Sequence, residues 1–207
     1  MSLVHRPYFS TFVDAVSFQL QREGISSNPD ELAANMALKP EVSTRTRKLA
    51  NSVLLPFAEH YVKSCRSRGP IEHSCHSISH GFAETLQQTD LADELPIAMT
   101  IGNVWFRNQN VYGVTRERIE RTIVEGFDPD KTIDLHVWLT LSDMTVVDLS
   151  ILSTLPALGL SASIPQDGSG VLIWREDQQS DFIYEPLLVD NQFFSKVERG
   201  IVVRSGA

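Results

Sequence analysis

The spacing of apolar residues changes once along this 207-residue chain, and that change limits the fold class. From about residue 8 to residue 88 the apolar positions recur at helical spacing. From about residue 97 onward, most segments are short, rich in β-branched and aromatic residues, and separated by turn residues. A block of helices followed by a block of strands with short connections is typical of an α+β fold. The sequence therefore predicts N-terminal helices followed by an antiparallel β-sheet.

Local signals set the limits of the expected helices. Gly24 ends the first helix, and Asn28 followed by Pro29 is a typical helix start because Asn caps the first N–H groups and Pro fits the first turn. Pro56 is expected to kink the third helix, since proline lacks the backbone N–H group. Helices are expected over residues 8–22, 29–38 and 41–66, and a further helix is expected within the stretch 71–88, with His73 or Ser74 as its N-cap.

The second part of the chain contains the strand signals. Residues 132–141 and 145–151 alternate with a period of two and flank Ser142-Asp143-Met144, which predicts a hairpin. Thr115 and Gly126 bracket a short helix as N-cap and C-terminal glycine. Strands are expected over residues 97–106, 132–141, 145–151, 171–174 and 182–184, with a helical turn and a strand between 193 and 203.

Composition limits the class of protein. With 42% hydrophobic residues the chain can bury a normal core, and we expect a single domain over 1–207, with a helical part at 1–68, a central part at 70–152 and a β-rich part at 153–207. The net charge of −8 disfavours binding to nucleic acid or to an anionic membrane surface. No run of 18 apolar residues is present, so no membrane span is expected. Cys65 and Cys75 are expected to be reduced, which predicts a cytoplasmic protein.

Cys75 is the candidate nucleophile. Gly69-Pro70 break the chain, and Ile78, Phe82 and Leu86 then recur at helical spacing, which places Cys75 in the first turn of a helix. The unpaired N–H groups and partial positive charge of a helix N-terminus favour the thiolate form of a cysteine.

The predicted hairpin supplies a histidine and an acid. The apolar residues of the two strands lie on the same face of the hairpin only if the residue numbers of each cross-strand pair add up to an even number. The simplest register that meets this condition pairs residue 139 with 145 and 137 with 147. That register sets His136 directly opposite Asp148, with Cβ atoms roughly 4.5–5.5 Å apart. A carboxylate beside an imidazole fixes its tautomer and stabilises the imidazolium.

These residues resemble a known family pattern. A cysteine that opens a helix, a Pro at a strand entry with a Gly six residues later, a His-x-Trp strand and an Asp on the next strand together resemble the transglutaminase-like superfamily. The corresponding residues here are Cys75, Pro96 with Gly102, His136-Val137-Trp138, and Asp148. The resemblance covers about residues 70–152.

The resemblance implies a papain-like core and acyl-thioester chemistry at amide bonds. It implies Cys75 as nucleophile, His136 as base and Asp148 as the residue that orients His136, with no cofactor and no metal. The implied substrate is a peptide or protein amide, and the implied reaction is peptide cleavage, deamidation or transamidation.

Other interpretations stay open at this point. The chain is alternatively an inactive transglutaminase-like binding module, or, less favoured, a zinc protein that uses His73, Cys75, His76 and His80. An acyl-transfer site also needs a second oxyanion donor beside the N–H of Cys75. The candidates for that donor are Asn51, His60, Tyr61 and the backbone around His73.

Overall fold

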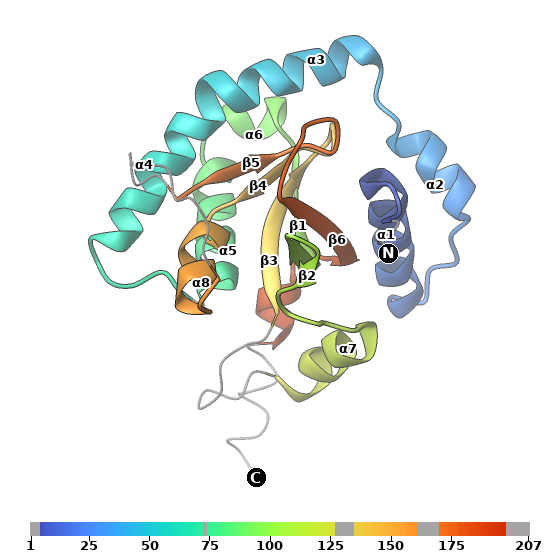
Figure 1. Ribbon diagram of the computed structural model, residues 1–207. Coiled ribbons are helices and arrows are strands. Elements are labelled where there is room, and N and C mark those ends of the chain that lie inside the picture. The colour runs from blue at the N-terminus through green and yellow to red at the C-terminus, as the bar shows by residue number, and fades with distance from the viewer. Residues whose placement is uncertain (1–4, 73, 127–134, 161–169, 198–207) are drawn as a thin grey trace. The chain divides into compact units, whose positions relative to one another are not determined.

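The computed structural model describes residues 5–72, 74–126, 135–160 and 170–197 (Figure 1). The predicted α+β class is confirmed, since the chain combines helices with antiparallel strand pairs. The described residues divide into two compact units. Unit 1 contains the chain up to Ala37, the segment Thr100–His136, and the chain from Glu176 onward; unit 2 contains Leu38–Met99 and Val137–Arg175.

Unit 1 is built around a helix that packs on an edge strand. β1 (Ile97–Phe106), most of which lies in this unit, pairs antiparallel with β2 (Gln109–Asn110) and with β6 (Phe182–Val189). The helix α1 (Tyr8–Arg22) contacts β6, and α2 (Pro29–Met36) and α7 (Arg116–Glu125) also belong to this unit. The register of β1 and β6 shifts between Ile101 and Gly102, where Gly102 pairs with Pro186. A proline is tolerated there because β6 needs no N–H at a bulge.

Unit 2 packs helices against a three-stranded antiparallel arrangement. α3 (Pro40–Leu49) continues through a π-helical segment, η1 (Ala50–Leu54), into α4 (Leu55–Arg66), and α5 (Cys75–Gln87) and α6 (Leu91–Glu94) follow. β3 (His136–Leu141), beyond its first residue, pairs with β4 (Val146–Asp148), which pairs with β5 (Leu172–Trp174); α8 (Ile151–Ala157) follows β4.

The kink expected at Pro56 takes the form of a π-turn. The N–H of Leu55 donates to the carbonyl of Ala50, five residues earlier. Pro56 cannot donate to a carbonyl four residues back, and its ring would clash with that carbonyl, so the extra residue in the turn relieves the conflict.

The core of unit 2 joins α5 to the hairpin. Ile78, Phe82 and Leu86 of α5 belong to one buried cluster that also includes apolar residues of β3, β4 and the residue after β4, namely Leu139, Leu141, Val147 and Leu149. The apolar face of α5 thus packs against the hairpin residues that were expected to share one apolar face.

The predicted hairpin register is wrong by two residues. Leu139 pairs with Val147 rather than with residue 145, so Asp148 comes opposite Trp138 and not opposite His136. The loop is Ser142-Asp143-Met144, as predicted: the N–H of Leu141 donates to Thr145 O at 2.8 Å, and closure at this pair sets residue 139 opposite residue 147. Met144 adopts φ 66°, and the Asp143 carboxylate accepts from both the N–H and the hydroxyl of Thr145. A three-residue hairpin loop closed by a left-handed residue sets this register.

The second hairpin strand is also shorter than predicted. β4 ends at Asp148, and Ile151 begins α8 instead of continuing a strand. The Asp148 carboxylate accepts hydrogen bonds from the N–H groups of Ser150 and Ile151, both at 3.0 Å, and these bonds turn the backbone into the helix.

Met144 provides a test of the loop. Valine at this position should lower the free energy of unfolding by about 1 kcal/mol, because a β-branched residue strongly disfavours positive φ. Asparagine, which tolerates that conformation, should leave stability within about 0.5 kcal/mol of the parent. Urea denaturation of Met144→Val and Met144→Asn makes the comparison. Equal stability of the two variants would contradict the left-handed loop.

Candidate functional site

Cys75 is the first residue of α5, as predicted, and its side chain is only 4% exposed. The preceding residue, Ser74, makes no side-chain cap to the helix. The Ser74 side chain, at the position that usually supplies the capping oxygen, therefore accepts no hydrogen bond from the first N–H groups of α5. Cys65 and Cys75 both carry thiols rather than a disulfide.

Ser79 connects the Cys75 face of α5 to the start of β3. Its hydroxyl, on a fully buried side chain, donates to the carbonyl of Val137 at 3.2 Å. Ser79 follows Cys75 by four residues, so both side chains lie on one face of the helix, one turn apart. The helix face that bears Cys75 is thus fixed to the backbone of the residue directly after His136.

His136 is fully buried at the first position of β3. Within unit 1 its ring stacks on Tyr112, with ring centroids 4.9 Å apart and planes 15° apart. A stacked aromatic neighbour restricts rotation of the imidazole about its χ2 angle, so the ring plane is set by packing.

Asp148 is fully buried at the end of β4. One of its oxygens, Oδ1, accepts the two backbone N–H groups that begin α8. Sequence reasoning did not foresee this role as a helix cap. It gives Asp148 a structural function in addition to any catalytic one.

The three predicted site residues fall in both units. Cys75 and Asp148 belong to unit 2, whereas His136 is the last residue of a unit 1 segment. That Cys75, His136 and Asp148 lie close enough to form one site therefore stays a prediction. Trp138, between His136 and the apolar end of β3, is fully buried.

Tyr61 lies too far along α5 to serve as the second oxyanion donor. A Cβ at Gly81 would lie 2.5 Å from the Tyr61 hydroxyl, so the tyrosine contacts the middle of the helix. Gly81 follows Cys75 by six residues, which corresponds to about 9 Å along the helix axis. His60 is exposed on α4, Asn51 accepts a hydrogen bond from Arg175 at 3.0 Å, and His73 lies outside the described residues.

Burial, together with the neighbouring Cys65, raises the pKa of Tyr61 to about 12. The ring also packs edge-on against Phe82, with centroids 5.3 Å apart. Tyr61 thus stays protonated at neutral pH and acts as part of the α4–α5 packing.

This raised pKa predicts an alkaline loss of stability that depends on Tyr61. The unfolded tyrosine ionises near pH 10, whereas the folded one keeps its proton up to about pH 12. The contribution of the protonated Tyr61 to the free energy of unfolding is complete below about pH 10 and declines as the pH rises toward 12. In urea denaturation, the stability advantage of the parent over Tyr61→Phe should therefore shrink between pH 9 and pH 12. A constant difference over that range would contradict the raised pKa.

The described residues provide no cluster of ligands for the zinc site that was considered from the sequence. Among these residues, no three His, Cys, Asp or Glu side chains are placed to hold a metal ion. His80 instead lies 3.6 Å from Glu84, one turn along α5. His73, the fourth proposed ligand, lies outside the described residues.

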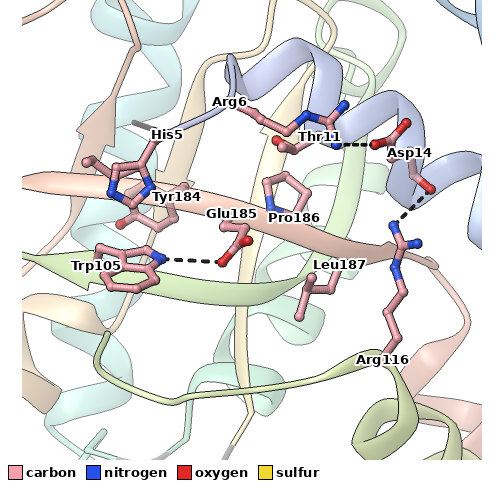
Figure 2. Close-up of a pocket in the computed structure, with 11 residues that line it drawn as sticks. His5, Arg6, Thr11, Asp14, Trp105, Arg116, Tyr184, Glu185, Pro186 and Leu187 are labelled. Atoms are coloured by element: carbon pink, nitrogen blue, oxygen red, sulfur yellow. Dashed lines mark hydrogen bonds and ion pairs between the residues drawn. The ribbon is translucent and has the colours of Figure 1, made fainter. Parts of the chain in front are cut away.

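A pocket of about 470 Å³ in unit 1 was not predicted from the sequence (Figure 2). It is lined by the residues before α1, by α1 itself, by β1 and β6, and by the start of α7. We call it the α1–β6 pocket. Its polar lining includes Glu185 of β6, Arg116 of α7, and Asp14 of α1.

Glu185 is held by two residues of the neighbouring strand. Its Oε2 accepts from Asn103 Nδ2 at 3.1 Å and from the Trp105 indole N–H at 3.3 Å. Asn103 pairs directly with Glu185 across β1 and β6, and it is fixed in turn by the N–H and carbonyl of Val114. The only sequence signal was the presence of polar and aromatic residues at alternate positions of β1.

Comparison with protein-family models, curated proteins and solved structures gives no match to this chain. No helix within the described ranges is both long and apolar enough to cross a membrane.

Proposed function

We propose that this chain is a transglutaminase-like cysteine hydrolase or acyltransferase that acts on amide bonds of a peptide or protein. The observation that carries the proposal is the hydrogen bond from Ser79 to Val137, because it fixes the helix face of Cys75 beside the strand position that follows His136. Cys75 is the nucleophile, His136 the general base and Asp148 the residue that orients His136.

The reaction proceeds through a thioester. The Cys75 thiolate attacks the amide carbonyl carbon, and the developing oxyanion is stabilised by N–H groups at the start of α5. His136, protonated in the thiolate–imidazolium pair, donates its proton to the departing amine as the C–N bond breaks. Water or a second amine then attacks the thioester carbonyl and gives its proton to His136, and the C–S bond breaks to release the Cys75 thiolate, which restores the thiolate–imidazolium pair. No cofactor is required.

Burial of two ionisable hairpin residues supports this assignment. His136 of β3 and Asp148 of β4 are both fully buried. Burying ionisable groups is costly, and such groups cluster at functional sites.

Thiol reactivity tests the nucleophile. We expect iodoacetamide to label Cys75 faster than Cys65 at neutral pH, with an apparent Cys75 pKa below the ordinary value of about 8.5. Burial alone predicts the opposite order, because Cys75 is 4% exposed whereas Cys65 is only half-buried. Peptide mass mapping after timed labelling measures both rates.

The labelling experiment has two controls. In concentrated urea the two thiols should react at similar rates, which shows that the fold causes the difference. Amide-library turnover should be abolished by Cys75→Ala and kept by Cys65→Ala. Faster labelling of Cys65 would end the proposal and favour a binding module. Turnover that survives Cys75→Ala would end it as well, because the catalysis would then not depend on this thiol.

Asp148 is tested by two substitutions that separate its charge from its cap. Asp148→Asn keeps an oxygen for the N–H groups of Ser150 and Ile151, so its stability should stay within about 1 kcal/mol of the parent, whereas Asp148→Ala should cost about 1–2 kcal/mol. Loss of the charge should nevertheless raise the apparent Cys75 pKa in Asp148→Asn and slow turnover at least about tenfold. An unchanged pH profile in the Asn variant would leave Asp148 with the cap alone.

A further inference from the structure

The α1–β6 pocket contains a carboxylate that has no cationic partner in the part of the chain that the structure describes. Glu185 accepts hydrogen bonds from the neutral groups of Asn103 and Trp105, and within the described ranges no Lys, Arg or His nitrogen lies within ion-pair distance of it. Asn103 is 5% exposed and is held at both ends of its amide by Val114. The negative charge is therefore held in place by a buried network and is not neutralised by the chain described.

Among the described residues, the Arg116 guanidinium in the same pocket has no acidic partner. Arg116 donates from Nη2 to the backbone carbonyl of Asp14 at 3.3 Å, and its guanidinium carbon lies 4.8 Å from the centroid of the Phe18 ring. Its Nε is buried and makes no hydrogen bond with the described residues. The Asp14 carboxylate does not neutralise Arg116, because it is paired with Arg6 at 2.6 Å (Figure 2).

Aromatic and imidazole groups stand beside the carboxylate. Trp105 both donates to Glu185 and contacts His5, with ring centroids 5.1 Å apart and planes 69° apart. An ammonium group near an indole ring and a carboxylate gains from both the cation–π interaction and the ion pair. Figure 2 shows Trp105 and Glu185 on one side of the pocket and Arg116 on the other.

We propose that the α1–β6 pocket binds a small zwitterion with a free ammonium group and a free carboxylate, which is the chemistry of an amino acid or a short peptide with free ends. The ammonium group pairs with Glu185 beside Trp105, and the carboxylate pairs with Arg116. A volume of about 470 Å³ is of the size that encloses a small-molecule ligand. The site lies wholly in unit 1, and its function does not depend on catalysis by Cys75.

Calorimetric titration of the full chain tests the charges of the ligand. The probes are alanine, dialanine, N-acetyl-dialanine and dialanine amide. We expect saturable binding of alanine or dialanine, and whichever binds more tightly distinguishes an amino-acid site from a peptide site. Blocking either end of dialanine should weaken binding by about tenfold or more, because each block removes one charge.

Two substitutions assign the ends of the ligand. Glu185→Gln keeps an oxygen for Asn103 and Trp105 but removes the charge, so it should weaken dialanine about tenfold and leave the weaker N-acetyl-dialanine unaffected. Arg116→Gln should weaken dialanine while leaving dialanine amide unaffected. Glu120→Gln, an exposed change of the same charge on α7 outside the pocket, is the matched control and should bind like the parent.

Thermal melts of each variant separate loss of binding from loss of fold, and Cys75→Ala should bind all probes like the parent. The proposal is overturned by the absence of saturable binding up to about 10 mM of either unblocked probe. It is also overturned if blocking the ends makes no difference, or if folded Glu185→Gln weakens the blocked and unblocked peptides equally.

Discussion

Unit 2 depends on the packing of α5 against the β3–β4 hairpin. The apolar side of the helix, through Ile78, Phe82 and Leu86, enters the same buried cluster as the apolar hairpin residues. Ser79 adds a directional bond to this non-directional packing, because its hydroxyl reaches the carbonyl of Val137. Apolar contact alone allows the helix to rotate or slide, whereas a buried hydroxyl needs its acceptor. The hydrogen bond therefore specifies which residues of α5 lie beside the start of β3, and Cys75 is one turn away.

Local sequence signals were sufficient for the helices and insufficient for the hairpin register. The limits of α1, the Asn28 cap of α2 and the Thr115 cap of α7 follow from interactions within a few residues, and the structure contains all three. The parity of the hairpin was also predictable, because a one-residue slip would reverse its faces. A two-residue slip keeps the same faces, so the apolar pattern cannot detect it. Only the geometry of the loop, with Met144 at positive φ, selects the observed pairing.

The features that the sequence did not reveal depend on residues distant in the chain or on competing local bonds. The Glu185 network joins Asn103 and Trp105 to a strand about eighty residues later, and no local periodicity specifies which strands pair. The helix α8 was hidden because Ile151 continues the alternation of β4, and the Asp148 carboxylate then offers the backbone N–H groups another acceptor. The pairing of β1 with β6 thus formed the α1–β6 pocket, and the Asp148 side chain ended β4.

Asp148 shows how one residue can serve structure and, in the proposed mechanism, chemistry. Capping two N–H groups of a seven-residue helix requires an oxygen, and a neutral Asn or Ser supplies one. A fully buried carboxylate instead carries a desolvation cost that a neutral cap avoids. The two N–H bonds to Oδ1 offset part of that cost and also fix the direction of the carboxylate. The cap accounts for an oxygen at this position and does not itself require a negative charge; in the proposed mechanism, that charge would stabilise an imidazolium at His136.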